Sequence, residues 1–172
     1  TGLTLYDSDQ RILNIYASSR WNGLPGGHSA YVTATTNTTN AQTVSTATNT
    51  TLTSTVWNSA VVTGLTTVSN GVITFGIAGK WLITGCIPFE TNGTGAREVA
   101  LVDQSGSTYV FDNIFQSNSL AESIGIINII LDTAASGTTS VRVDVYQNSG
   151  GNLLVGKQNN RPTNFVAIFL GS

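Results

Sequence analysis

The residues able to carry acid–base or metal chemistry are few in this sequence. It contains one histidine, His28, and one cysteine, Cys86. His28 lies in the Gly/Pro-rich stretch GLPGGH, and no serine stands in the small-residue turn that exposes a nucleophile in hydrolases. Zinc sites need a cluster of cysteines and histidines, which one residue of each kind cannot form. The sequence therefore predicts no catalytic residue and no enzyme activity.

The carboxylates are also too scattered to predict a site. Asp7 and Asp9 lie close together, but a calcium ion takes roughly six or more oxygen ligands, so we interpret this stretch as a solvated turn. Glu90, Arg97 and Glu98 flank the turn NGTG, where an ion pair that stabilises the turn is the favoured interpretation. The sequence also lacks a phosphate-binding loop and a dinucleotide fingerprint. We expect no metal ion and no cofactor.

The composition excludes several classes of partner. The 172 residues carry a formal net charge of −2, and only 9% are charged, against about 25% in ordinary soluble domains. The seven Lys and Arg residues form no cluster that would neutralise phosphates, so a nucleic-acid partner is not expected. No stretch approaches the ~20 apolar residues that span a membrane, so membrane insertion is not expected either. A surface of Thr, Ser, Asn and Gly fits a close-packed assembly, but Thr-rich β proteins share this composition, and both explanations stay open.

The N-terminal residue is compatible with two explanations of where the chain begins. The chain starts with Thr1 and contains no methionine. A small gene product that has lost its initiator methionine would begin in this way, and so would a trimmed fragment of a longer protein. No signal-peptide pattern is present in the sequence.

Alternating apolar and polar residues predict β-strands over most of the chain. In VRVDVY, residues 141–146, every second residue is apolar, which puts one face on a core and the other toward water. The turn residues NSGG follow, and NFVAIFL, residues 164–170, is apolar at nearly every position, as in a strand buried on both faces. Further strands are expected at 56–62, 72–75, 81–89, 97–102, 108–111 and 124–131, with a loop at 133–139. About eight strands without a helical pattern predict an all-β, two-sheet antiparallel sandwich or jelly roll.

Residues 1–40 differ from the rest and are expected to form an extended N-terminal arm with short strands. The GLPGGH stretch is flexible by composition, and the short apolar pieces are too small to build a core. Their apolar and aromatic side chains therefore favour contact with a partner. The candidate contact residues are Leu3, Leu5, Tyr6, Ile12, Leu13, Ile15, Tyr16 and Trp21.

Four stretches of the remaining chain resemble the C1q/TNF-like jelly roll in its bacteriophage form. They are ITFGIAGKWLITGCIPFE (73–90), NGTGAREVALVDQSGS (92–107), VRVDVYQNSGGNLLVG (141–156) and NFVAIFLGS (164–172). The resemblance implies a C1q/TNF-like jelly-roll domain over residues 41–172 and leaves the arm outside it. Two loops depart from the family pattern, because the 132–139 loop is longer and less charged and the turn after Val102 lacks Asn-Gly. For that reason no ligand site is carried over from the family.

The resemblance also implies a homotrimer packed around a threefold axis. Residues 124–131 and the C-terminal strand carry more apolar residues than a strand with one buried face needs, which is consistent with such packing. The candidate trimer-interface residues are Ile124, Ile126, Ile129, Phe165, Ile168 and Phe169. The alternative, that both strands lie wholly inside the sandwich, stays open. The expected core includes Trp57, Trp81, Phe89, Phe165 and Phe169, with Cys86 as a buried thiol.

The function that this combination predicts is structural. We expect a non-enzymatic virion protein of a bacteriophage, a trimeric cement or decoration protein on the outer capsid surface. Its arms would clamp the major capsid protein or another virion protein by adding strands to exposed sheet edges. Three-point attachment would make a weak arm contact effectively strong.

Two other functions stay open. The same domain fits the receptor-binding head of a tail fibre or tailspike, located at its distal tip, that recognises a host-surface glycan or protein. Its receptor-facing loops would then include Asn92, Gly93, Asn148, Ser149 and Asn152. A secreted C1q-like signalling or adhesion module is the third hypothesis, which the single cysteine and the missing signal-peptide pattern disfavour.

Overall fold

The protein is built from antiparallel β-strands. The computed structural model describes backbone and side chains of residues 41–57, 67–104, 106–117, 119–156 and 163–171. Five strands are described by their backbone alone: β1 (Thr4–Asp7), β2 (Ile12–Ala17), β3 (Arg20–Gly23), β4 (Ser29–Thr33) and β7 (Ser59–Thr63). All described strand pairings are antiparallel. The predicted all-β antiparallel architecture is therefore confirmed.

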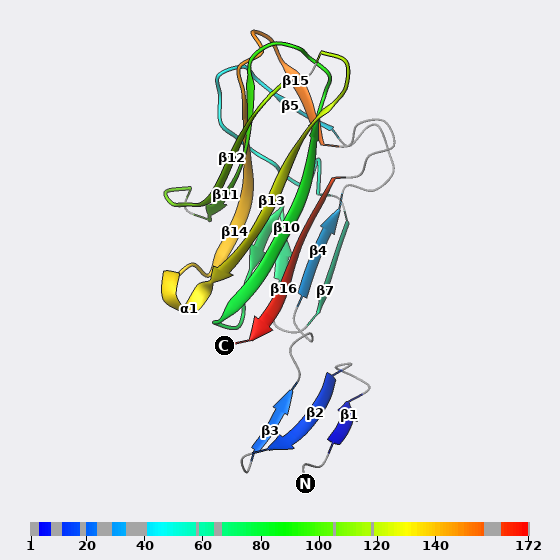
Figure 1. Ribbon diagram of the computed structural model, residues 1–172, viewed down its shortest axis with the longest axis vertical. Helices are drawn as coiled ribbons and strands as arrows, with labels where there is room; N and C mark the ends of the chain where they lie inside the picture. The colour runs from blue at the N-terminus through cyan, green and yellow to red at the C-terminus, as the bar shows by residue number, and fades with distance from the viewer. Residues whose placement is uncertain are drawn as a thin grey trace.

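Two stacked sheets form the body of the protein (Figure 1). We name the first the β10 sheet. Its strand order is β5 (Ala41–Val44), β15 (Leu153–Gly156), β10 (Lys80–Phe89), β16 (Asn164–Gly171), β4 and β7. Strands β15 and β16 pair with one edge of β10, and β13 (Ser123–Asp132) pairs with its other edge. The second, the β11 sheet, runs in the order β12 (Tyr109–Gln116), β11 (Ala96–Asp103), β14 (Ser140–Gln147), β9 (Val72–Thr74) and β8 (Thr67–Ser69). The short strand β6 (Thr50–Thr51) also pairs with β14. The chain changes sheet after β9, β10, β12, β13 and β14, so it crosses repeatedly between the two sheets, as in a jelly roll.

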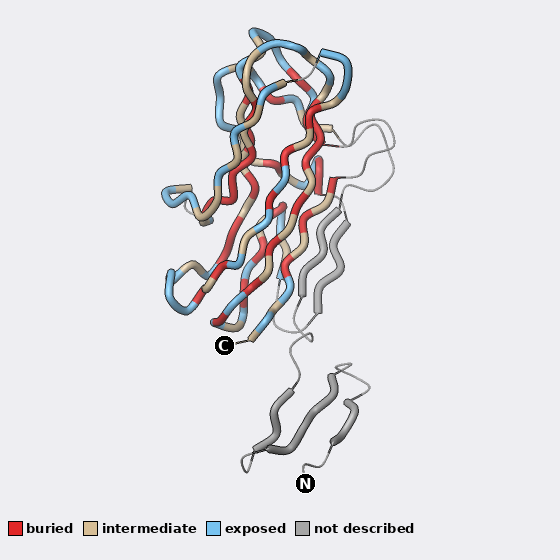
Figure 2. The backbone as a smooth tube through the Cα atoms, in the orientation of Figure 1, coloured by how far each residue is buried: buried red, intermediate tan, exposed pale blue. Residues whose placement is uncertain are grey.

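The core lies between the two sheets and follows from the period-two alternation of each strand. The buried residues of β10 include Trp81, Ile83 and Ile87, and those of β14 include Val141, Val143 and Val145. Figure 2 shows this alternation as red segments separated by tan or pale blue ones along the same strand. Phe89 and Phe115 come from different sheets and meet edge to face, with ring centroids 5.6 Å apart. Of the expected core residues, Trp57, Trp81, Phe89 and Phe165 are buried, and Phe169 is half-buried against the core.

The C-terminal strand differs from the expectation that it is buried on both faces. Phe165 and Ala167 point into the core, whereas Ile168 and Leu170 are exposed. Cys86 is also only half-buried rather than enclosed, because it alternates with Gly85 and Ile87 and so lies on the outward side of β10. Both differences have one cause: the outward face of this sheet is apolar without being covered in the single chain.

Two segments have a local structure that the sequence analysis did not predict. The strand expected at 56–62 begins later, as β7 from Ser59, after a turn at 54–56. The loop expected at 133–139 opens with a one-turn helix, α1 (Thr133–Ser136). The Asp132 carboxylate caps it by accepting hydrogen bonds from the backbone N–H of Ala134 and of Ala135, both at 3.1 Å, and Gly137 ends it with a φ of 68°.

The segment expected as an arm contributes to two different sheets. Strands β1, β2 and β3 form a three-stranded sheet of their own. Strand β4 instead pairs with β16 on one side and with β7 on the other. Residues 29–33 therefore belong to the β10 sheet of the body, and the segment that precedes it ends before Ser29.

The body has two different ends. Strand β10 begins at Lys80 opposite Asp132 and Gly171, so this end carries α1 and the C-terminus, and we name it the α1 end (Figure 1). Strand β4 enters the sheet at the same end, because Ser29 pairs with Ile168. The opposite end, named the loop end, carries the connections that follow β10, β12 and β14. The chain therefore passes from the first three strands into the body at the end that lies away from these loops.

A substitution at Gly125 tests the packing between the sheets. A Cβ added at Gly125 would overlap the side chain of Val99 and lie 3.2 Å from a ring carbon of Phe115. We expect Gly125→Ala to destabilise the fold by about 1–3 kcal/mol through overpacking. Thermal unfolding should then show a Tm several degrees lower, since each kcal/mol shifts Tm by roughly 2–4 °C at this size.

Gly151→Ala is the matched control for this substitution. A Cβ at Gly151 would have no neighbour within 4 Å, and its backbone has no positive φ. Its Tm should stay within about 1–2 °C of the unsubstituted protein, since surface changes usually lie within ±0.5 kcal/mol. Equal unfolding temperatures for the two variants would contradict the tight packing of β13 against β11.

Candidate functional site

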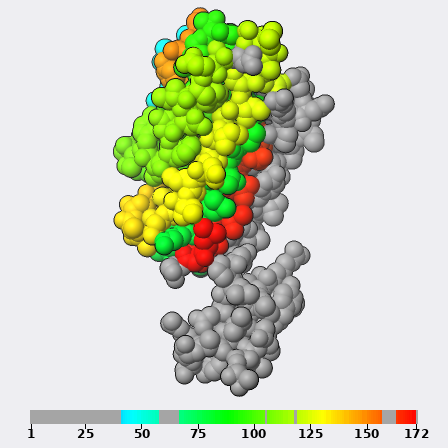
Figure 3. Space-filling model, viewed as in Figure 1, coloured from blue at the N-terminus to red at the C-terminus, as the bar shows by residue number. Residues whose placement is uncertain are grey.

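The outward face of the β10 sheet is an apolar surface in the single chain. Leu82 on β10 lies between Ile130 on β13 and Ile168 on β16, all three on the outward side. The most exposed large aliphatic side chains here are Ile130 (60%), Ile126 (47%), Leu170 (41%) and Ile168 (38%). In Figure 3 the yellow, green and red surfaces of β13, β10 and β16 lie side by side on the face toward the viewer. We name this surface the apolar sheet face.

Charged residues are absent from the central part of the apolar sheet face. Lys80 lies opposite Asp132 at the α1 end, and at the loop end Glu90 follows β10 and Glu122 precedes β13. Between these limits the described residues of β10, β13 and β16 include no Asp, Glu, Lys or Arg. Thr84, Asn128 and Asn164 are the polar residues on this side. A continuous apolar patch of this kind on a sheet is typical of a surface that another protein covers.

The candidate trimer-interface residues divide between this face and the core. Ile124, Ile126 and Ile168 lie on the outward side. Ile129 and Phe169 point inward and pack against the core, and Phe165 is completely buried in it. Phe165 therefore has no surface to offer a second copy. Sequence analysis missed the outward residues Leu82, Ile130 and Leu170. A period of two counted from Ile126 and Ile168 leads to Ile130 and Leu170, whereas Leu82 lies on another strand and is placed on this face only by its pairing.

The candidate receptor loops meet at the loop end. The Asn148 side-chain oxygen accepts a hydrogen bond from the backbone N–H of Ala96 at 2.6 Å, and the Asn148 N–H donates to the carbonyl of Ala96 at 3.3 Å. These bonds join the loop that contains Asn92 and Gly93 to the loop that contains Asn148, Ser149 and Asn152. No sequence pattern predicts that these two loops are neighbours, because Ala96 and Asn148 are 52 residues apart.

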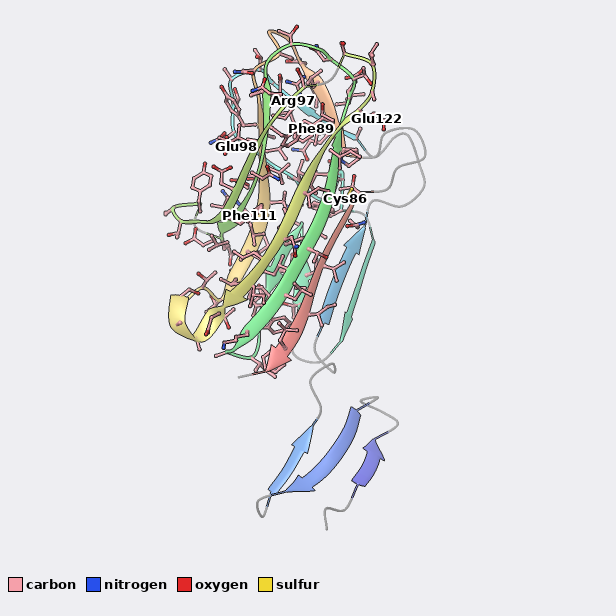
Figure 4. The ribbon with its side chains drawn as sticks, viewed as in Figure 1. Cys86, Phe89, Arg97, Glu98, Phe111 and Glu122 are labelled. Carbon is pink, nitrogen blue, oxygen red and sulfur yellow. The ribbon has the colours of Figure 1, made fainter. Side chains whose placement is uncertain are left out.

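Arg97 is fully buried beneath these loops, near Phe89 in Figure 4. Its guanidinium donates to three backbone carbonyls, from Nη1 to Thr94 at 2.9 Å and Ala96 at 3.0 Å, and from Nη2 to Asn92 at 3.0 Å. Its Nε has no partner among the described residues. Burial lowers the pKa of the Arg97 guanidinium, because loss of water disfavours the charged form. Arg97 therefore fixes the course of the 92–96 loop through its carbonyls.

The ion pair expected among Glu90, Arg97 and Glu98 is absent, so that interpretation was wrong. The Glu90 carboxylate accepts from the backbone N–H of Leu154 at 3.0 Å. Glu98 follows Arg97 in the strand and so lies on the opposite, outward face of the β11 sheet. Partial burial raises the pKa of Glu98, and the neighbouring Asp112 carboxylate, which shares a hydrogen bond with it, raises it further. The described ion pair is instead Arg142 with Asp144, at 3.0 Å.

The described residues offer little for catalysis. Glu98 and Asp112 lie on an open sheet face, and the pocket of about 280 Å³ lies elsewhere, lined by Asp103, Gln104, Thr108 and residues 136–140. No group of three or more His, Cys, Asp or Glu within the described ranges is arranged to hold a metal ion. No helix among those residues is both long and apolar enough to cross a membrane.

Several candidate residues lie where side chains are not described. Leu3, Asp9 and His28 fall outside the described residues. The other arm candidates lie on β1, β2 and β3, for which the backbone gives the register. This register places Tyr6 opposite Leu13 and Tyr16 opposite Trp21. The partner-contact role of the arm therefore stays a prediction.

Arg97 should matter more for stability than any exposed arginine of the body. We expect Arg97→Met to destabilise the fold by roughly 2–4 kcal/mol, since buried carbonyls left without a donor cost about 1–3 kcal/mol each. Arg142→Met is the comparison, because this arginine forms a half-buried ion pair with Asp144, with side-chain exposures of 23% and 13%, and donates to a single backbone carbonyl, that of Gln104, so we expect a loss of about 1–2 kcal/mol. Urea unfolding followed by tryptophan fluorescence measures both losses. Equal losses would mean that the Arg97 carbonyl contacts contribute no more than the half-buried ion pair of Arg142.

Comparisons with known proteins identify the fold. No protein-family model matches the chain, and no curated protein matches its sequence. The PRD1 vertex protein P5, a phage protein, has a similar structure, with a TM-score of 0.55 and 15% identity over 84% of this chain and 97% of that one. Eiger TNF from S. frugiperda is similar with a TM-score of 0.52 and 12% identity, over 86% of this chain and 94% of that one. Together with the strand order described above, these similarities establish that the chain has a jelly-roll fold of the C1q/TNF-like type.

Proposed function

We propose that this protein is a non-enzymatic structural component of a bacteriophage virion, a trimeric cement or decoration protein on the outer capsid surface. The observation that carries the proposal is the apolar sheet face, an uncharged surface that a second copy would cover. The similarity to a vertex protein supports the choice of a virion, although a fold by itself hosts many functions. Within the described residues, no group of three or more His, Cys, Asp or Glu is arranged to hold a metal ion.

The apolar sheet face has the properties of a subunit interface. Its residues come from three adjacent strands, so the surface is continuous and rigid. Interfaces between identical subunits are more apolar than ordinary surfaces and poor in charge at their centre, as this face is. We take the number of subunits, three, from the C1q/TNF-like resemblance, because an apolar face fits any closed symmetric assembly.

The path of the chain supports attachment through the N-terminal segment. Strand β4 begins at the α1 end, so residues 1–28 join the body there and the loop end lies opposite. If the arms bind the major capsid protein or another virion protein, the α1 end faces the capsid and the loops face outward. Strands β1 to β3 have the length and the pairing that strand addition to a neighbouring sheet requires.

A receptor-binding head of a tail fibre or tailspike is the second candidate function. The observation that favours it is the convergence of the Asn92 and Asn148 loops at the end opposite the chain entry. The same polarity would present these loops to a host surface. The number of copies on the particle separates the two functions, because cement covers the shell and fibre heads occur only at the tail.

The apolar sheet face can be tested with one charged residue. Ile130→Lys should convert the trimer to a monomer, because assembly would bury an unpaired ammonium, which typically raises a dissociation constant more than about a hundredfold. Light scattering coupled to size-exclusion chromatography measures the mass. Reaction of Cys86 with a thiol reagent provides a second readout, since this outward residue should be protected in the trimer and reactive in the monomer.

Ile114→Lys is the matched control for the interface test. Ile114 is 63% exposed, as strongly as Ile130, but lies on the outward face of the β11 sheet. This variant should remain a trimer with Cys86 protected. A trimeric Ile130→Lys protein would show that subunits do not meet on the apolar sheet face.

Deletion of residues 1–27 tests the attachment role. The deletion ends before β4, so the body sheets and the apolar sheet face keep all their strands. We expect an intact trimer that no longer sediments with virus particles, because the contact of each arm with the capsid is lost. Cryo-electron microscopy of particles should show many trimers over the shell with the full chain and none with the deletion.

One outcome would contradict attachment through the arm, and another would contradict the capsid role. Undiminished binding of the truncated protein would locate attachment in the body instead of the arm. A few copies confined to the tail would replace the cement function by the receptor-binding function, while leaving the trimer and the arm attachment in place.

A further inference from the structure

Four loops form one surface at the loop end. They comprise residues 45–49, 91–95, 119–121 and 148–152, and we name them the loop cluster (Figure 1). Besides the pair of bonds between Asn148 and Ala96, the Gly150 N–H donates to the hydroxyl of Thr46 at 3.1 Å. Gly93 lies so close to Ser119 that an added Cβ would be 3.1 Å from its Cα. Segments far apart in the sequence therefore meet in a continuous surface.

Two buried polar side chains hold the loop cluster in place. Arg97 donates to the carbonyls of the 92–96 loop, as described above. Gln147, also fully buried, donates to the carbonyls of Val44 at 3.0 Å and Gly151 at 2.7 Å and accepts from the Ser149 N–H at 2.7 Å. Burying a guanidinium without a carboxylate is unfavourable, so these contacts indicate that a defined loop conformation matters. A surface fixed in advance loses less entropy when a ligand binds.

The chemistry of the loop cluster is neutral. Its sequences are STATN, TNGTG, SLA and NSGG followed by Asn152, and none contains a charged residue. Hydroxyl, amide and backbone groups supply both donors and acceptors. Leu120 adds one large apolar side chain that is 93% exposed. Glu90 and Glu122 adjoin two of these segments, so the charge beside the surface is negative and an acidic ligand would find no complementary charge there.

A neutral carbohydrate fits this surface better than a protein does. Sugar hydroxyls both donate and accept hydrogen bonds, as the amides and hydroxyls of the cluster do, and the C–H faces of a sugar ring can contact an aliphatic side chain. Protein–protein contacts depend mainly on Trp, Tyr and Arg, and the four loop segments contain none of these residues, while the exposed Tyr109 beside them has its hydroxyl hydrogen-bonded to Asn49 at 3.1 Å. We propose that the loop cluster is a binding site for a neutral oligosaccharide. The proposal concerns the body alone and does not depend on attachment to a capsid.

The probe for this proposal is a printed array of uncharged hexose and N-acetylhexosamine oligosaccharides, with sialylated and uronic-acid oligosaccharides beside them. We expect the full-length protein to bind a group of neutral oligosaccharides in a saturable way. Binding should be the same at about 0.05 M and about 0.5 M NaCl, since salt screens only charged contacts. Leu120→Glu and Asn152→Asp should each weaken it by about tenfold or more, because both side chains are exposed on the cluster.

Ala135→Glu is the control, since it places the same new charge on exposed α1 at the opposite end and should bind normally. Circular dichroism establishes that all three variants are folded. Three results would overturn the proposal: no retention of any neutral oligosaccharide, equal binding by the loop variants, or binding confined to acidic sugars and abolished by salt. Sugar binding by a protein that fails to attach to capsids although its residues 1–27 are present would count against the cement role only.

Discussion

The pairing of strand β10 on both of its edges is the constraint on which the rest of the structure depends. It holds β13 on one side and β16, then β15, on the other, so its register fixes which residues of three further strands point inward. Trp81 and Ile83 then build the core, while Leu82 places the apolar sheet face on the other side. A shift of the β10 register by one residue would exchange the inward and the outward residues. The same strand pairing therefore determines both the core and the outward surface.

The sequence was sufficient for the architecture because alternation is a local property. The sandwich, the antiparallel pairing and most core residues followed from it. It was insufficient for the C-terminal strand, where both faces are apolar and a period of two cannot distinguish them. Only the pairing of Ile168 with Leu82 and of Phe165 with Gly85 shows which face is covered. Phe165 was therefore an interface candidate although it is a core residue.

The loop end was unpredictable for a different reason. Arg97 has carboxylates nearby in the sequence, which favoured an ion pair, but adjacent strand residues point to opposite faces and Glu98 is therefore out of reach. Arg97 instead donates to backbone carbonyls. Because every residue has a backbone carbonyl, no sequence pattern predicts which of them a buried arginine will contact. The contact between Asn148 and Ala96 likewise joins segments brought together only by the pairing of β11 with β14. The conformation of these loops therefore depends on contacts made by the whole fold and could not be predicted from a local sequence motif.

The distribution of charge favours one of the two explanations of the unusual composition. If low charge were a general habit of Thr-rich β proteins, both sheets would share it. The β11 sheet instead carries Glu98, Asp112, Arg142 and Asp144 on or near its outward face, whereas β10, β13 and β16 carry charge only at their ends. Charged side chains lose conformational entropy and hydration when a second surface covers them. The absence of charge from one face therefore lowers a free-energy cost only if that face is covered. The composition therefore favours an assembly in which the β10 sheet faces other copies and the β11 sheet faces water.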